Sequence, residues 1–130
     1  MDALLDRLNP QQQLAVAAPP GHTLVLAGPG SGKTRVLTFR IAYLISVFKV
    51  PAHNILAVTF TNKAAKQMGE RVTNLIGPNA EGIWLGTFHA ICGRILRREA
   101  DLLPVNKNYV IFDTDDQQAL MKQILRDNNL

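Results

Sequence analysis

The segment Ala27–Thr34 constrains the fold of this chain more than any other part of the sequence. It reads AGPGSGKT and directly follows the apolar run Leu24–Leu26. The spacing matches the phosphate-binding P-loop, G-x-x-x-x-G-K-[ST], except that Ala27 stands in place of the first glycine. Because such a loop joins a buried strand to the start of a helix, the segment predicts an α/β fold.

Each residue type in this loop has a chemical reason to be there. Glycines let backbone N–H groups close around a phosphate chain, and a helix that begins near Gly32 turns its positive end toward the same anion. Lys33 supplies a charge for the outer phosphates, and the Thr34 hydroxyl suits Mg²⁺. We therefore expect a magnesium nucleoside triphosphate; the alternative is a glycine-rich turn that only caps a helix. The expected binding residues are Ala27, Gly28, Pro29, Gly30, Ser31, Gly32, Lys33 and Thr34.

Composition places the chain among globular proteins. It has 130 residues, of which 47% are hydrophobic and 18% charged, and its net charge is +4. That charge permits an anionic partner without requiring one. No run approaches the 18 apolar residues of a membrane span, and the first residues do not form a secretion signal. Cys92 is the only cysteine, so we expect no internal disulfide and a cytoplasmic location.

Four apolar runs predict the strands of a parallel sheet: 23–27, 55–60, 83–85 and 109–112. The first two are continuously apolar, as expected for strands covered on both faces. Helical stripes lie between the runs, so the predicted architecture is a doubly wound P-loop sheet with flanking helices, an incomplete domain. The stripe positions are Leu37, Ile41, Leu44, Ile45 and Phe48; Ala65, Met68, Val72, Leu75 and Ile76; and Phe88, Ile91 and Ile95.

Two further helices are predicted from their first residues. Asn9 followed by Pro10 reads as an N-cap with proline at the first helical position. Thr114 followed by Gln117 reads as a capping box that opens a helix near the end of the chain.

Polar and aromatic side chains follow two of the predicted strands. One segment runs from Thr59 to Lys63 and the other from Gly86 to His89. Both are expected at the carboxyl edge of the sheet, beside the P-loop, where ligands of open α/β sheets collect. Aromatic faces with hydroxyl and amide groups suit single-stranded nucleic acid. The equally weighted alternative is that Phe60 and Phe88 are core residues and Thr61 only caps a helix.

The order of these motifs resembles the superfamily 1A DNA helicases of the UvrD, PcrA and Rep type. The resemblance covers essentially the whole chain, through LNPQQ, AGPGSGKTR, AVTFTNKAAKQM, GTFHAICGRILRR and IFDTDDQ. The usual sequence of this loop in the family is AGxGSGKT. Ala27 is therefore the usual residue at its position, and Pro29 is a mild departure from the family pattern. The resemblance implies that residues 1–112 form the amino-terminal part of a RecA-like ATP-binding domain 1A. It also implies that residues 113–130 start the passage toward helical subdomain 1B.

The resemblance also implies roles for individual residues. Gln12 would read the adenine edge and Arg35 would lie beside the base or ribose, which makes ATP the cofactor. Lys33 and Thr34 would serve catalysis, as the phosphate lysine and the Mg²⁺ ligand. The implied DNA-binding residues are Phe60, Thr61, Asn62, Lys63, Thr87, Phe88 and His89.

The implied function is ATP-driven 3′-to-5′ movement along single-stranded DNA, in repair, replication or recombination. The family's acidic motif, arginine fingers and second RecA-like domain all come later than residue 130. We therefore expect the remainder of a helicase chain as a partner, and little activity from these 130 residues alone. A non-catalytic nucleotide or DNA-binding module is one alternative. A P-loop kinase is another, although the sequence shows neither an arginine-rich lid nor an acceptor site.

Overall fold

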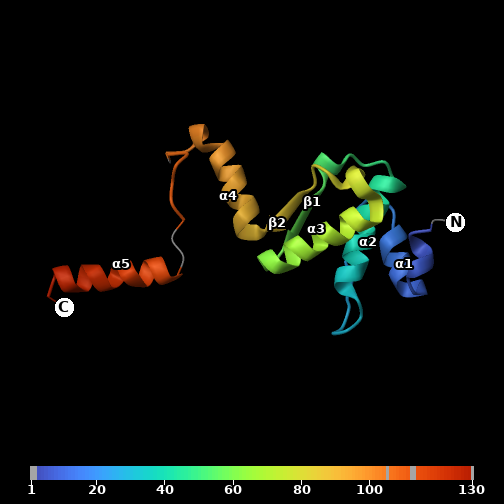
Figure 1. Cartoon of the computed structure of the whole chain (residues 1–130), viewed down its shortest axis with the longest axis horizontal. Helices are drawn as coiled ribbons and strands as arrows, with labels where there is room; N and C mark the ends of the chain where they lie inside the picture. Colours follow the sequence, from blue (N-terminus) through green and yellow to red (C-terminus); the bar gives the residue numbers. More distant parts are fainter. Residues whose placement is uncertain (1–2, 105, 112–113, 130) are drawn as a thin grey trace. The chain divides into compact units, whose positions relative to one another are not determined.

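A computed structural model describes residues 3–104, 106–111 and 114–129, which belong to two compact units, 1–92 and 93–130. Figure 1 shows the elements along the chain. The helices of the first unit are η1 (Leu5–Arg7), α1 (Pro10–Ala17), α2 (Lys33–Ser46), η2 (Ala52–Asn54), α3 (Asn62–Ile76) and η3 (Gly77–Ala80). They are followed by α4 (Phe88–Arg98), which spans the division, η4 (Ala100–Leu102) and α5 (Thr114–Asp127). Among the described residues, no helix is long and apolar enough to cross a membrane.

The sheet of the first unit pairs two parallel strands, β1 (Leu56–Thr59) and β2 (Trp84–Thr87). Leu56 lies opposite Trp84 and Thr59 opposite Thr87. Helix α3 is the crossover between them, and it packs against both strands and against α2 (Figure 1). The strands predicted at 55–60 and 83–85 are confirmed, and so are the helical stripes that became α2, α3 and α4.

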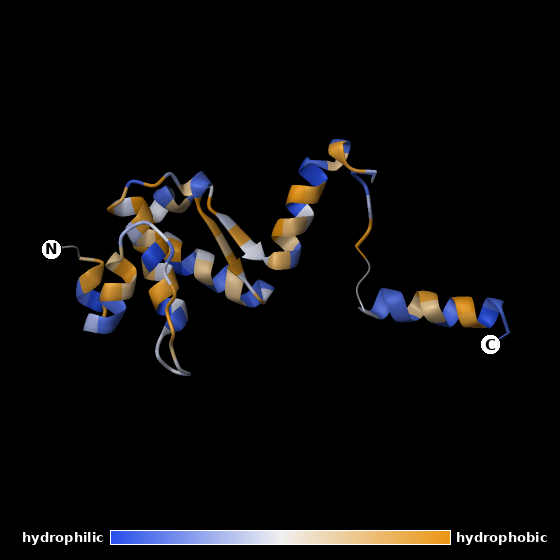
Figure 2. Ribbon diagram, turned by 180° about the vertical axis from the view of Figure 1, so that it is seen from behind, coloured by the Kyte–Doolittle hydropathy of each residue, from blue (hydrophilic) through white to orange (hydrophobic). Residues whose placement is uncertain are grey.

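The strand predicted at 23–27 is wrong for this structure. The segment is an extended loop that pairs with neither β1 nor β2, and Leu24 and Leu26 are 83% and 86% exposed. Figure 2 shows it as a hydrophobic stretch in the loop that leads into α2. A continuously apolar strand gains its stability from paired edges and covered faces, and nothing described here supplies them. The described fold is thus a mixed α/β unit with a two-stranded parallel sheet and flanking helices; the wider doubly wound sheet is not formed.

The strand predicted at 109–112 is also wrong over 109–111, and Phe112 lies outside the described residues. Tyr109 is held by its side chain instead of a strand ladder. Its hydroxyl donates a hydrogen bond of 3.0 Å to the carbonyl oxygen of Gly93, and the Arg97 guanidinium lies 5.2 Å from the centre of its ring. The predicted helix at the end of the chain is confirmed as α5, although residue 113, which precedes it, is not described.

Helix α2 joins the two hydrophobic clusters of the first unit. On one side Ile41 packs with residues of the sheet and α3, among them Ala57 and Met68. On another side Phe39 and Tyr43 pack with residues of the amino-terminal segment, among them Leu8 and Val16. Because α2 begins directly after the P-loop, this packing fixes the helix end that carries the candidate site.

Candidate functional site

The P-loop has the backbone conformation that its glycines permit. Gly30 and Gly32 have φ values of 75° and 80°, in the left-handed region that side chains other than glycine rarely adopt. A Cβ atom at Gly32 would also lie 2.8 Å from Nε2 of Gln12. The backbone angle of Gly32 therefore favours glycine at this position, and a Cβ there would also displace the end of the Gln12 side chain.

The Lys33 ammonium lies against the carbonyl oxygens of the same loop. Its Nζ donates hydrogen bonds of 3.0 Å to Gly28 and 3.3 Å to Ala27. The hydroxyl of Ser31 also donates to the Gly28 oxygen, at 2.6 Å. Both Lys33 and Thr34 are exposed at the first turn of α2. Lysine is a mobile cation, so it can turn from neutral carbonyl oxygens to an anion with little cost.

The N terminus of α2 differs from those of its neighbours, because no side chain caps it. In α1 the Asn9 side chain accepts a hydrogen bond from the Gln12 amide, and in α3 the Thr61 side chain accepts one from the Ala64 amide. The first N–H groups of any helix lack acceptors within the helix itself. In α2 no side chain accepts a hydrogen bond from these donors, which is an arrangement that suits an anion.

Gln12 connects α1 to the P-loop. Its Nε2 donates a hydrogen bond of 3.1 Å to the carbonyl oxygen of Ser31, while its Oε1 accepts one of 3.2 Å from the Asn9 amide in a capping box. The adjacent Gln13 instead donates to Leu5 and Leu8 in the preceding segment. Of these two glutamines, only Gln12 reaches the candidate site.

Arg35 lies in the first turn of α2, and its guanidinium points toward η1. Its Nη2 donates a hydrogen bond of 2.6 Å to the Arg7 carbonyl oxygen, and the group lies 5.2 Å from the centre of the Phe39 ring. The predicted place of Arg35 beside a base or ribose stays a prediction.

A cavity of about 530 Å³ lies between the P-loop segment and α2. Its polar lining residues are Thr23, Ser31, Lys33 and Arg40, and apolar side chains such as Val25 and Leu37 line it as well. The size is within the range of roughly 300–1,000 Å³ typical of small-molecule sites.

Phe60 and Phe88 form an exposed aromatic pair where β1 and β2 end. Their ring centres are 6.1 Å apart with an angle of 54° between the planes, and their side chains are 92% and 55% exposed. The alternative that they are core residues is thus wrong. The helix-capping role of Thr61 is confirmed, because its hydroxyl accepts the Ala64 amide at 3.1 Å.

The other predicted residues at this edge also lie near the strand ends. Asn62, Lys63 and His89 are exposed, and the buried Thr87 accepts a hydrogen bond of 3.2 Å from the Ala90 amide. The structure thus brings the two segments after β1 and β2 together. Over the described part of the chain, the hydrogen bonds of the P-loop run within the loop and to α1, and none reaches these strand ends.

Arg40 is a structural residue that the sequence did not single out. It donates to the carbonyl oxygens of Val16, Ala18 and Pro19 and so joins α2 to the end of α1. Unsatisfied carbonyls at a helix end are a usual partner for arginine, but only the tertiary structure shows which arginine reaches them.

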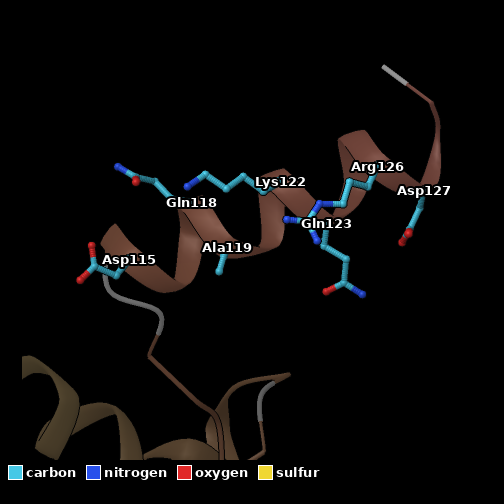
Figure 3. Close-up of a pocket in the computed structure, with 7 residues that line it drawn as sticks. All are labelled: Asp115, Gln118, Ala119, Lys122, Gln123, Arg126 and Asp127. Atoms are coloured by element: carbon cyan, nitrogen blue, oxygen red, sulfur yellow. The ribbon is translucent and has the colours of Figure 1, made fainter.

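A further hollow, on the surface of α5, is not a binding site. Its lining residues all come from this one helix, and Figure 3 shows Gln118 and Ala119 leaving it on opposite sides. Among the described residues, no second element contributes to this hollow. Nor do the described residues include any cluster of three or more histidine, cysteine or acidic side chains that could hold a metal ion.

Comparison with known proteins identifies the class to which this fold and loop belong. Residues 8–130 match the family model of the UvrD/REP helicase N-terminal domain, and the chain belongs to this family. The resemblance drawn from the sequence is thereby confirmed.

Its relatives include ATP-dependent DNA helicases named PcrA. The chain is 55% identical to PcrA of Bacillus subtilis (strain 168) over 127 residues, which are 98% of this chain and 17% of that protein. It is 51% identical to PcrA of Staphylococcus aureus (strain Mu50) over 130 residues, which are 100% of this chain and 18% of that protein. The chain thus spans less than a fifth of the length of these relatives.

Proposed function

We propose that this chain is the ATP-binding segment of an ATP-dependent DNA helicase that moves 3′ to 5′ along single-stranded DNA. The observation that carries the proposal is the N terminus of α2, which directly follows the P-loop and has no side-chain cap, together with Lys33, whose ammonium lies against the same loop. Membership of a helicase family supports the nucleic-acid part of the proposal. The processes proposed are DNA repair, replication or recombination, in the cytoplasm.

The residues around the loop fit a magnesium–ATP complex. Gly30 and Gly32 have no Cβ atom and adopt positive φ values, which lets an anion approach the backbone N–H groups of the loop, and the helix end adds a positive potential. Lys33 would bind the outer phosphates, and the exposed Thr34 hydroxyl would bind Mg²⁺. When bound, the complex supplies a phosphoryl group whose hydrolysis releases free energy. The side chain of Gln12, which donates a hydrogen bond to Ser31, would recognise the base through its amide group.

Single-stranded DNA is the proposed substrate of the surface beyond β1 and β2. The exposed rings of Phe60 and Phe88 offer stacking faces, which bind bases regardless of sequence. Thr61, Asn62, Lys63, Thr87 and His89 complete this proposed DNA-binding surface. The remainder of a helicase chain would supply the acidic motif, the arginine fingers and the second RecA-like domain.

The proposal can be tested by replacing the matching segment of Bacillus subtilis PcrA with this chain. We expect the chimaera to hydrolyse ATP faster when single-stranded DNA is present, and to displace a strand only from substrates with a 3′ single-stranded tail. Lys33→Ala in the chimaera should reduce turnover by about 10²–10³, since one electrostatic donor to a transition state is typically worth that factor. Undiminished turnover in the variant would contradict the proposal.

The same assay separates the alternatives. A kinase would consume ATP only with a phosphate acceptor, and a binding module would not consume it at all. The 130-residue chain alone should hydrolyse ATP negligibly, because a missing arginine finger costs about 10³–10⁵ in rate. DNA-stimulated turnover by the chain alone would contradict its description as a segment of a motor.

A further inference from the structure

Three arginines from three different elements line one cavity of the first unit. Arg7 comes from η1, Arg35 from α2 and Arg71 from α3, and the cavity has a volume of about 520 Å³. Thr38, Phe39, Asn74 and Leu75 complete its walls. None of these residues lines the cavity beside the P-loop, so the two cavities are distinct.

Two of the guanidinium groups are held in place. Arg7 and Arg35 lie 5.7 and 5.2 Å from the centre of the same Phe39 ring, and Arg35 also donates to the Arg7 carbonyl oxygen. Phe39 is 5% exposed and Thr38 is 2% exposed, so packing holds this part of the cavity wall in place. Preorganised guanidinium groups lose little freedom when they bind a ligand.

Within the described residues, no acidic side chain forms an ion pair with this cluster of arginines. Asp6 and Glu70 are the sequence neighbours of Arg7 and Arg71, yet neither makes an ion pair with any of the three arginines within the described part of the chain. Arg71 makes no hydrogen bond, ion pair or ring contact there. Three like charges around one hollow create a positive potential that favours an anion.

We infer that this cavity, named here the three-arginine cavity, binds a small phosphate-bearing anion at a site separate from the P-loop. Arginine presents several N–H donors in a planar fork that matches phosphate oxygens. The amide of Asn74 and the hydroxyl of Thr38 are further polar groups in its wall. The volume far exceeds the roughly 30 Å³ of one water molecule in the liquid, so a diphosphate group fits.

The experiment is a titration of the ¹⁵N-labelled protein with sodium pyrophosphate at constant ionic strength, observed through the arginine Nε–Hε resonances. We expect the signals of Arg7, Arg35 and Arg71 to shift along one saturable curve, while that of the exposed Arg126 on α5 does not. Arg71→Gln should weaken this binding about tenfold, because it removes one charged hydrogen-bond donor to the anion. The matched control Arg126→Gln should change it less than twofold.

A second variant separates this site from the P-loop, which also attracts phosphate. In Lys33→Ala the saturable curve of the three arginines should persist, whatever happens to ATP hydrolysis. ADP is titrated into Lys33→Ala in place of pyrophosphate. A saturable curve shared by all three arginines would show that the cavity accepts the phosphates of a nucleotide, and a shared curve with pyrophosphate alone would show that it accepts only the free anion. The proposal is overturned if all arginines shift alike without saturation, or if the curve disappears in Lys33→Ala. Because Arg71 is exposed and forms no hydrogen bond, ion pair or ring contact with the described residues, the folded state of Arg71→Gln can be verified by an unchanged amide spectrum elsewhere.

Discussion

The side-chain amide of Gln12 donates a hydrogen bond of 3.1 Å to the carbonyl oxygen of Ser31, 19 residues further along the chain. The same glutamine completes the capping box of α1 with Asn9. The start of α1 and the P-loop are thus fixed to each other by one residue. A change at Gln12 will therefore alter both the helix cap and the loop.

Replacement of Gln12 by alanine should lower the free energy of unfolding by about 1 kcal/mol, because it removes the side-chain hydrogen bonds to Ser31 and Asn9 and one such bond typically contributes about 0.5–1.5 kcal/mol. It should also weaken ATP binding, because the loop loses a support. Gln11→Ala is the matched control, since Gln11 is the exposed neighbour in the same helix. Thermal denaturation and ATP titration measure the two effects. Equal behaviour of the two variants would show that the link to Ser31 has no energetic role.

Gly32→Ala should destabilise the folded chain by about 1–2 kcal/mol, the usual cost of a left-handed conformation for a residue with a Cβ. The new methyl would also displace Gln12, whose Nε2 lies 2.8 Å from its position. Gly28→Ala is the control for stability, because its φ is not positive and no atom lies within 4 Å of its Cβ position. Urea denaturation compares the two, and similar midpoints would contradict the backbone argument.

Phe60→Ala should leave the melting temperature nearly unchanged, because the side chain is 92% exposed. In the chimaera it should weaken binding to single-stranded DNA by about 1–3 kcal/mol, the usual contribution of one stacked base. Phe39→Ala should instead lower the melting temperature, since truncation of a buried phenylalanine costs about 3–5 kcal/mol of stability. Fluorescence anisotropy with a labelled oligonucleotide measures the affinity. If Phe60→Ala binds single-stranded DNA with full affinity, Phe60 is not part of the proposed DNA-binding surface.

The double change Leu24→Ser and Leu26→Ser should reduce self-association of the 130-residue chain without lowering its melting temperature. Both side chains are more than 80% exposed, and contiguous exposed apolar residues promote association. Leu8→Ser is the contrasting variant, because Leu8 is buried and its replacement should destabilise the fold. Sedimentation velocity at several concentrations measures association. Self-association that is unchanged in the double variant would show that another surface is responsible.

Sequence patterns predicted the elements whose partners are close along the chain. Strands β1 and β2 and helix α3 form one parallel crossover unit, and their apolar periodicity was sufficient to place them. The run 23–27 has the composition of a buried strand, but a strand also needs neighbours, and those depend on tertiary structure. The motif Ala27–Thr34 could be recognised because its spacing has few other causes, and its role in phosphate binding stays a prediction. The cluster of Arg7, Arg35 and Arg71 could not, because these residues meet only through the packing of three elements.

The most direct test is a titration of the 130-residue chain with magnesium and ATP, followed by calorimetry, in the unaltered protein and in Lys33→Ala. Lys122→Ala, an exposed lysine on α5, is the control for loss of one positive charge. We predict saturable, weak binding in the unaltered chain and in the control. In Lys33→Ala we predict affinity at least about tenfold lower, because hydrogen bonds to charged groups contribute about 1.5–3 kcal/mol. Equal affinity in all three proteins would contradict the assignment of the P-loop as the ATP site.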